Sequence, residues 1–281
     1  MLSYRHSYHA GNHADVLKHT ILIQLLRYLG QKEKAFCVID THAGAGVYAL
    51  DSVHAEKLGE YRDGIGRLWE RQDLPPALAE YVAQVRELNG DGPLRHYPGS
   101  PWLAKNALRE QDRLRLFELH STDFRTLDKN FGQGNKQTIV YADDGFAKLK
   151  ALLPPASRRG LTLIDPSYEM REDYARLIQV LKEAQERFPI GTYAVWYPIL
   201  SKPESRQLPH KLKALGLANW LHVTLSVRGP SPDGIGMQGS GMFIINPPWT
   251  LAQTLQAEMP WLVKALAADP GAGFTLEHVS S

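Results

Sequence analysis

The sequence predicts an α/β fold with a mainly parallel sheet. Its composition, with 43% hydrophobic and 22% charged residues, is that of an ordinary globular protein. Short Val, Ile, Leu and aromatic runs alternate with segments of helical pattern, which is typical of βαβ units joined into a parallel sheet. Seven runs are strand candidates, at residues 36–40, 114–119, 138–142, 161–164, 192–196, 221–227 and 242–245.

Charge and cysteine content exclude several classes of protein. The net charge is +2, so any nucleic-acid surface must be a local patch. The single cysteine, Cys37, lies in an apolar run, which excludes an internal disulfide framework and suggests a reducing compartment. The N-terminus has no apolar signal core, and the longest apolar stretches are too short to span a bilayer. We therefore expect a cytoplasmic protein without a membrane partner.

The first predicted element is a helix at 13–29, which Asn12 can cap and Gly30 can end. The spacing that follows is abnormal. A βαβ unit needs roughly 30 residues, and the gap from Asp40 to Leu114 is roughly twice that. The excess contains two helix-like stretches, at 58–69 and 78–88. We therefore expect a main domain of residues 1–51 and 98–281, with an inserted helical subdomain at 52–97.

A glycine turn follows the first strand. It reads Asp40-Thr41-His42-Ala43-Gly44-Ala45-Gly46, and Gly44 and Gly46 let the backbone approach a ligand closely because glycine has no Cβ. Residues 44–49 also fit the dinucleotide pattern G-x-G-x-x-A. That interpretation expects an acid at the end of a second strand about 20 residues on, and the region near Glu60 shows no strand.

Acidic residues follow further strands of the predicted sheet. Glu118 ends the second strand and can accept hydrogen bonds from both hydroxyls of a ribose. Asp143 and Asp144 follow the third strand, where an acid can accept from the amino group of an adenine. Since the carboxyl ends of parallel strands meet at one edge of a sheet, we expect these acids and Asp40 to surround one crevice. An adenosyl cofactor, S-adenosylmethionine, fits this series.

A second loop, Asp165-Pro166-Ser167-Tyr168, follows the fourth strand. Loops of this type hold an exocyclic amine, which is a poor nucleophile because its lone pair is conjugated. The Asp165 carboxylate and the Pro166 carbonyl can both accept its hydrogens and aim the nitrogen at a methyl group. Tyr168 can stack on a base that has left its helix. The pattern predicts methylation of an exocyclic amine.

Two other patterns are assigned to structure rather than chemistry. Asn246-Pro247-Pro248-Trp249 matches an amine-methylation loop, but a helical pattern starts right behind it, so we expect Asn246 as N-cap and Pro247 at N1. Histidines crowd the first 19 residues, but a glycine–asparagine pair separates His9 from His13 and no cysteine lies nearby. We therefore expect no metal site.

Several longer blocks resemble one family. The run from His6 to His19, the glycine turn at 40–46, and the blocks at 97–101, 117–120, 157–160, 196–198 and 240–249 are similar to the RlmJ family of large-subunit ribosomal RNA methyltransferases, which make N6-methyladenine in 23S rRNA. The resemblance covers nearly the whole chain. It implies a Rossmann-like class I methyltransferase fold with a seven-stranded, mostly parallel sheet and a small helical insertion. It also implies S-adenosylmethionine as cofactor and a monomer acting on RNA.

The resemblance also implies roles for individual residues. Asp165 is the catalytic acceptor, and Tyr4 and His6 belong to an N-terminal tail that helps to place the target adenosine. Ser167 departs from the family, which has a second proline there, and an extra acid makes the choice between Asp143 and Asp144 open. The implied cofactor contacts are Lys18, His19, His42, Ser100, Glu118, Asp144 and Gly145.

A ribosomal substrate needs a basic patch that tracks phosphates. Its candidates are Arg5, Arg62, Arg67, Arg71, Arg158, Arg159, Lys202, Arg206, His210, Lys211 and Lys213. We therefore predict an adenine-N6 methyltransferase acting on 23S rRNA. The alternatives are a DNA adenine-N6 methyltransferase, an NAD-dependent oxidoreductase that uses the glycine turn, and an RNA-binding protein without turnover.

Overall fold

The computed structural model describes residues 6–132, 136–231, 233–234 and 236–280. Its centre is an eight-stranded sheet with the order β10-β8-β9-β7-β6-β1-β4-β5. All of the predicted strands belong to it, so the α/β prediction is confirmed. They are β1 (Cys37–Asp40), β4 (Arg113–Phe117), β5 (Thr138–Tyr141), β6 (Gly160–Ile164), β7 (Thr192–Ile199), β8 (Trp220–Ser226) and β9 (Gly239–Ile245).

The strand order reverses beside β1. From β1 the chain moves outward through β4 and β5 on one side, and β6 and β7 continue on the other side, all in parallel. Open α/β sheets bind ligands outside the carboxyl ends of the strands at such a reversal. β9 runs antiparallel to both β7 and β8. An additional edge strand, β10 (Gly273–Val279), pairs with β8 and is mostly exposed, which explains why it has no apolar run.

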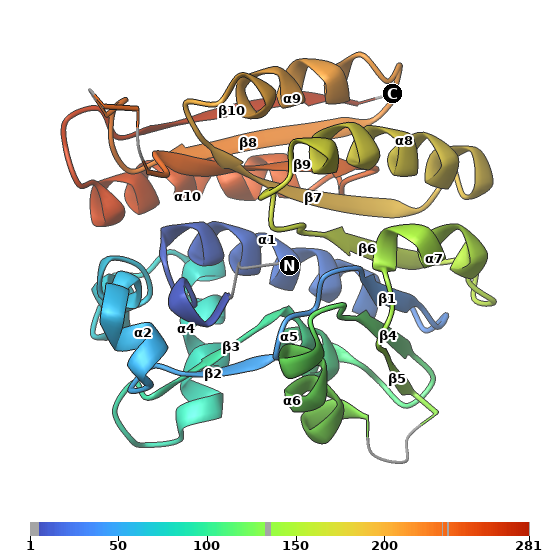
Figure 1. Ribbon diagram of the computed structural model, residues 1–281, viewed down its shortest axis with the longest axis horizontal. Coiled ribbons are helices and arrows are strands. Elements are labelled where there is room, and N and C mark those ends of the chain that lie inside the picture. The colour runs from blue at the N-terminus through green and yellow to red at the C-terminus, as the bar shows by residue number, and fades with distance from the viewer. Residues whose placement is uncertain (1–5, 133–135, 232, 235, 281) are drawn as a thin grey trace.

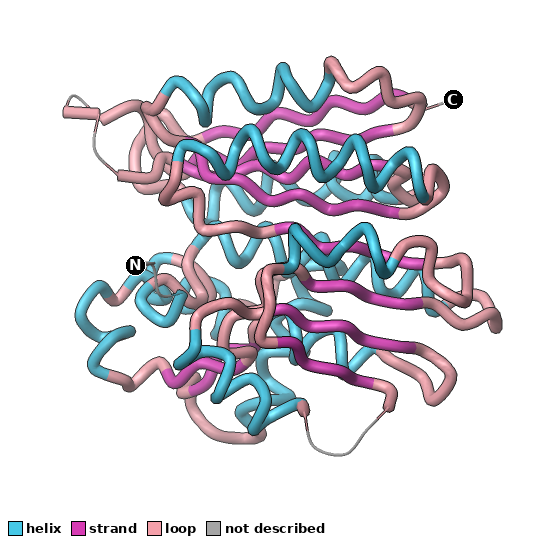
Figure 2. Tube along the Cα trace, turned by 45° about the vertical axis from the view of Figure 1, so that its right-hand side comes forward, coloured by secondary structure: helices cyan, strands magenta, loops and turns pink. Residues whose placement is uncertain are grey.

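The sheet lies between two layers of helices (Figures 1 and 2). Successive residues of a strand face opposite sides, and Val38 packs in one core cluster while Cys37 and Ile39 pack in the other. The first cluster includes side chains of α1 (His13–Gly30), α5 (Ser100–Ala107), α6 (Ser121–Phe131) and α10 (Leu251–Leu266). The second includes side chains of α7 (Gly145–Leu152), α8 (Arg171–Arg187) and α9 (Pro203–Lys213).

Helix α1 begins where the sequence predicts, because Asn12 Oδ1 accepts from the backbone N–H groups of Ala14 (3.0 Å) and Asp15 (3.1 Å). The helix is buried on nearly all sides, and its buried residues include Asp15 and Lys18. Buried charges require partners. The partners of these two residues lie in the site described below.

The segment at 52–97 is helical. It contains α2 (Val53–Leu58), the 3-10 helix η2 (Glu60–Asp63), α3 (Gly66–Trp69) and α4 (Pro76–Asn89). Strands β2 (Val47–Ala49) and β3 (His96–Pro98) pair at its base. Buried α4 side chains share a core cluster with α1, and Glu258 of α10 accepts from the Ala77 and Leu78 backbone N–H groups. That this segment forms a separate subdomain stays a prediction.

Candidate active site at the strand ends

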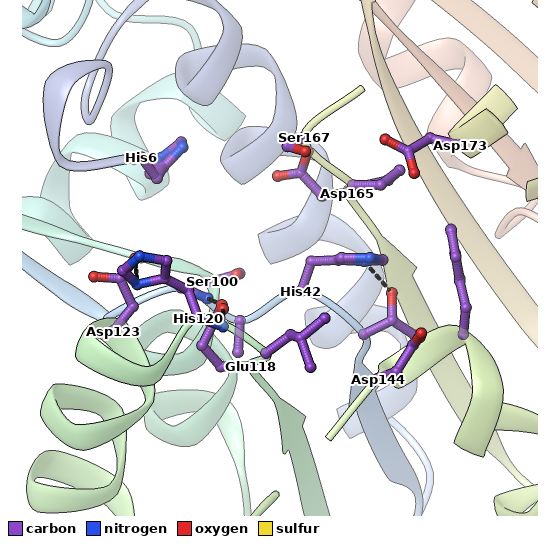
Figure 3. A pocket seen from close by; sticks show the side chains of 18 of the residues that line it. His6, His42, Ser100, Glu118, His120, Asp123, Asp144, Asp165, Ser167 and Asp173 are labelled. Atoms are coloured by element: carbon purple, nitrogen blue, oxygen red, sulfur yellow. Dashed lines mark hydrogen bonds and ion pairs between the residues drawn. The ribbon is translucent and has the colours of Figure 1, made fainter. Parts of the chain in front are cut away.

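One large cavity opens at the carboxyl ends of β1, β4, β5 and β6, with about 1120 Å³ of empty space including its mouth. Helix α1 and the 3-10 helix η1 (His6–Tyr8) also contribute to its wall. Figure 3 shows Asp165 and Ser167 on one side, with Glu118 and Asp144 across from them. The predicted site residues that line the cavity are His6, Lys18, His19, His42, Gly44, Ser100, Glu118, Asp144, Gly145, Asp165 and Pro166.

The glycine turn and Glu118 form one unit. The Gly44 N–H donates to Glu118 Oε2 (2.8 Å), and the His120 N–H donates to Glu118 Oε1 (2.7 Å). Gly44 has φ +61°, a conformation that glycine adopts readily. Gly46 has φ +79° and does not line the cavity, and a Cβ there would meet the Phe131 ring at 2.4 Å. Gly46 therefore allows the turn to pack, and Gly44 lines the cavity wall.

Asp40 does not line the cavity, which corrects its expected position. Its carboxyl is buried, with Oδ2 accepting from Ser100 Oγ (2.7 Å) and Oδ1 accepting from the His42 N–H (3.2 Å). Burial raises the pKa of Asp40 to about 6. The structure thus gives Asp40 a supporting contact between the glycine turn and α5, while its partner Ser100 lines the cavity.

Asp144 caps helix α7 and lines the cavity. Its Oδ1 accepts from the Ala147 N–H (3.2 Å), and its Oδ2 accepts from Arg176 of α8 (2.6 Å). Burial acts to raise the pKa of Asp144, but the hydrogen bond and charge of Arg176 together with backbone N–H groups of α7 outweigh it, and the pKa is lowered. Asp143 also lines the cavity, and it pairs with Lys148 (3.1 Å). Which of the two acids contacts a cofactor stays a prediction.

Gly145 lies directly against the first loop of the sheet, since a Cβ there would be 2.2 Å from Thr41 O and 2.7 Å from Thr41 Cα. If the cavity holds the adenosyl cofactor that the sequence predicts, Gly145→Ala should push α7 away from that loop and weaken binding of S-adenosylhomocysteine about tenfold, because Gly145 lines the cavity and overpacking shifts of this kind cost about 1–3 kcal/mol. Calorimetric titration measures it. Gly30→Ala is the control, because nothing lies within 4 Å of a Cβ there; equal affinity of both variants would contradict the prediction.

Asp165 is held by a buried ion pair. Lys18 Nζ donates to Asp165 Oδ2 (2.5 Å) and also contacts Asp15 Oδ1 (2.9 Å). Asp15 Oδ2 accepts from His6 Nε2 and from the Gly11 N–H, both at 2.9 Å. Burial acts to lower the pKa of Lys18, but Asp15 and Asp165 outweigh it, so the pKa is raised and the ammonium stays charged. The carboxylates that pair with Lys18 are therefore side chains of the protein itself, Asp15 and Asp165.

His19 lies beside this ion pair and is neutral, because burial lowers its pKa to about 3. Its Nδ1 is 2.7 Å from the hydroxyl of Tyr97, which in turn lies 3.0 Å from the hydroxyl of Tyr81 on α4. Its Nε2 makes no hydrogen bond within the described residues. His19 thus offers a neutral polar edge in the cavity wall.

Tyr168 does not present its ring to a base, which corrects the stacking expected from the sequence. The side chain is 2% exposed, and its hydroxyl donates to the Trp196 carbonyl (2.6 Å). Its φ is +54°, which is uncommon for a bulky residue. Tyr168 therefore anchors the loop at 165–168 to β7.

Several residues that line the cavity were not predicted as site residues from the sequence. Phe146, Asp173 and Arg176 line the cavity, as do Asp123 and Tyr48. Phe146 directly follows Asp144-Gly145, and its position after a strand-end acid is a usable signal. Arg176 and Asp173 lie on α8, a helix rich in charged residues on its exposed face, where no spacing distinguishes them. Tyr4 lies outside the described residues.

The expected basic patch is dispersed. Arg158 and Arg159 precede β6, at the end of the sheet opposite the cavity, and Arg159 donates to the Leu29 carbonyl (2.9 Å). Lys202 and Arg206 lie at the start of α9, which follows the carboxyl end of β7. Three other candidates are already in ion pairs, and Arg5 is not among the described residues. The ion pairs are Arg67–Asp63, Arg71–Asp73 and Lys213–Glu277.

The described residues were compared with the requirements of a metal site and of a membrane-spanning helix. They include no group of three or more His, Cys, Asp and Glu side chains arranged to hold a metal ion. None of their helices has the length and apolar character required to cross a membrane.

The Asn246–Trp249 motif is not part of the site. Ile245 pairs with Tyr193 at the amino end of β7, opposite the cavity. The predicted N-cap role of Asn246 is wrong, because α10 begins at Leu251 with Thr250 as its N-cap. Asn246 has φ +52°, and its side-chain amide donates to the carbonyls of Pro189 (2.7 Å) and Gly191 (2.8 Å). It ties two loops together.

The cavity is strongly acidic. Among the described residues, its permanently charged cations are Lys18 and Arg176, and each is paired with a carboxylate of the cavity. The histidines His19 and His42 are neutral, because burial lowers their pKa to about 3 and about 4. The carboxylates that line the cavity are Glu118, Asp123, Asp143, Asp144, Asp165 and Asp173.

Known proteins resemble this chain over most of its length. The family model described as "Ribosomal RNA large subunit methyltransferase D, RlmJ" matches residues 33–279. The Haemophilus influenzae protein named ribosomal RNA large subunit methyltransferase J is 47% identical over 281 residues, covering 100% of this chain and 99% of the relative. The Escherichia coli protein of the same name is 49% identical over 262 residues, 93% of each. A crystal structure of a Legionella pneumophila protein superposes with a TM-score of 0.89 at 37% identity, covering 97% of this chain and 99% of the other.

Proposed function

We propose that this chain, which belongs to the RlmJ family of ribosomal RNA large subunit methyltransferases, transfers the methyl group of S-adenosylmethionine to the N6 amino group of an adenine in 23S rRNA. The observation that carries the proposal is that Asp165 and the glycine turn line the same cavity. A cofactor at the turn and a base at the acceptor loop would therefore share one cavity.

The charge of the cavity supports a sulfonium cofactor over a dinucleotide. Opposite charges attract strongly at a partly buried site, so an excess of carboxylates favours a positively charged sulfonium. A dinucleotide would bring a doubly charged pyrophosphate, and the described cavity cations Lys18 and Arg176 are both engaged with carboxylates. The NAD-dependent alternative is therefore disfavoured by the site itself.

The acceptor loop supports amine methylation. Lys18 occupies Asp165 Oδ2, while Asp165 Oδ1 makes no hydrogen bond within the described residues and is available to an amine. Pro166 lines the cavity beside it. When bound, S-adenosylmethionine supplies an electrophilic methyl group on a positively charged sulfur. The protein contributes position, and a carboxylate that favours the positive charge developing on nitrogen.

The kind of RNA substrate that we expect depends on how an adenine can reach Asp165. An adenine inside a helix cannot reach Asp165, so an unstacked base in a loop or an opened helix is the substrate. Lys202 and Arg206, near the carboxyl end of β7, are the candidates on the cavity side for phosphate contacts. We propose action as a monomer in the cytoplasm, without a metal.

Methyl transfer by the purified protein tests the proposal. The protein is incubated with labelled S-adenosylmethionine and either protein-free 23S rRNA or duplex DNA, and nucleosides are analysed by mass spectrometry. We expect N6-methyladenine in the RNA alone. The same product in DNA alone would support the DNA methyltransferase alternative, and RNA binding without product would support a protein without turnover.

The departure at Ser167 is expected to have little effect on the reaction. Ser167 makes no hydrogen bond within the described residues, so a proline there removes no hydrogen bond that the structure shows. We expect Ser167→Pro to keep the methylation rate within about threefold of the unmodified protein, since only the stiffness of the loop changes. Steady-state kinetics on rRNA check this. A folding defect in the variant would show that the loop requires a backbone conformation closed to proline.

A further inference from the structure

Arg176 lines the cavity, and the proposed reaction gives it no role. It lies on the second turn of α8, six residues after Met170, the N-cap that ends the acceptor loop. Its guanidinium donates to Asp144 Oδ2 (2.6 Å) and lies 5.2 Å from the centre of the Phe146 ring. It therefore contacts two cavity residues at the start of α7. Both follow the carboxyl end of β5, where we expect the adenine of the cofactor to bind.

The contacts of Asp144 leave its carboxylate little freedom. Oδ1 is held by the Ala147 N–H at the start of α7, and Oδ2 is held by Arg176. A carboxylate fixed by donors at both oxygens stays ionised and acts only as an acceptor. Each oxygen still has a second lone pair, so such a carboxylate can receive a hydrogen from an amino group but repels a carbonyl oxygen.

We propose that Arg176 is a positioning residue, which fixes Asp144 as the acceptor for the amino group of the cofactor's purine and so makes the cavity select an amino purine over a keto purine. The inference deepens the proposed function and rests on it. Arg176 also lies over the ring of Phe146, and both side chains line the cavity. Removing the guanidinium releases Asp144 Oδ2 and removes the cation from the face of the Phe146 ring.

A purely structural role must be distinguished, because Arg176 also joins two helices. The chain offers a matched control in Lys150 of α7, which pairs with Glu183 of α8 (3.2 Å). That pair joins the same two helices and does not line the cavity. If Arg176 merely fastens α7 to α8, Lys150→Met and Arg176→Met should have similar consequences.

The test compares two ligands on three variants by calorimetry at neutral pH. The ligands are S-adenosylhomocysteine and its deaminated analogue S-inosylhomocysteine, which carries a keto group in place of the amino group. We expect Arg176→Met to weaken S-adenosylhomocysteine binding about 5- to 30-fold and to reduce the preference over the inosyl analogue by a similar factor. Lys150→Met should leave both quantities within about twofold, and Arg176→Lys should restore part of the preference because an ammonium can still pair with Asp144.

The outcomes separate the inference from the proposed function. If the unmodified protein does not bind S-adenosylhomocysteine, the proposed function fails and the inference fails with it. If it binds but Arg176→Met retains both the affinity and the preference, the inference alone is overturned. Equal losses in Arg176→Met and Lys150→Met, without a change in preference, also overturn it, since the ion pair would then act only between helices.

Discussion

Replacing Asp165 with alanine should reduce the rate of methyl transfer about 10²- to 10³-fold, while the affinity for S-adenosylhomocysteine changes little. A single preorganised group that stabilises developing charge is worth this much in other enzymes. Asp165 Oδ1 is free within the described residues, and Lys18 holds Oδ2. The substitution therefore removes the side-chain acceptor for the amine and leaves Glu118, Asp144 and the glycine turn in place.

Asp165→Asn separates geometry from charge at the same position. The amide keeps one oxygen acceptor but not the negative charge, so we expect its rate to lie between those of the alanine variant and the unmodified protein. Single-turnover rates on an rRNA fragment with saturating cofactor measure the chemical step. An alanine variant as fast as the unmodified protein would remove Asp165 from the reaction.

The parts of the fold and site that the sequence predicts share one property: each is signalled locally. An apolar run marks each of β1, β4, β5 and β6, and an acid or a glycine turn follows directly. Since parallel strands align their carboxyl ends, short-range signals are sufficient to bring Gly44, Glu118, Asp144 and Asp165 together. Strand β10 lacks such a signal because it is mostly exposed.

The parts that the sequence does not predict depend on the direction of a side chain or on long-range pairing. Asp40 faces Ser100 rather than the cavity, and no local pattern distinguishes the two directions at the end of a strand. Tyr168 combines a positive φ with a buried side chain, and the sequence signals neither. Arg176 reaches Asp144 from an element 32 residues away. Lys18 is predicted as a cofactor contact, and no local pattern indicates that its ammonium pairs with Asp15 and Asp165.

Lys18→Met should lower the free energy of unfolding by about 3–5 kcal/mol at pH 7.5, because removing one member of a buried ion pair leaves the others uncompensated. Lys18 is 4% exposed, and Asp15 is 1% exposed. Urea unfolding followed by circular dichroism measures the difference. A loss below about 1 kcal/mol would show that water or other donors replace the ammonium.

The pH dependence of this loss has a definite sign. Burial acts to raise the pKa of Asp15, but His6 and Lys18 outweigh it and hold the pKa well below its usual range. A depressed carboxyl pKa contributes stability above the unfolded pKa, and that stability is lost as the pH falls through the folded pKa. Without Lys18 the pKa of Asp15 rises, so protonation relieves the buried charge at a higher pH. The difference between variant and unmodified protein should therefore shrink as the pH falls from 7.5 toward 5.

A double variant distinguishes what Lys18 does for folding from what it does for catalysis. Lys18→Met removes the ammonium and leaves the buried Asp15 carboxylate uncompensated. Adding Asp15→Asn removes that carboxylate charge as well, so part of the lost stability should return. The methylation rate should not return with it, because Asp165 still lacks the ammonium that holds Oδ2 and orients Oδ1 toward the amine. Recovery of both quantities would mean that Lys18 serves only to compensate Asp15, and that the acceptor loop keeps its geometry without it.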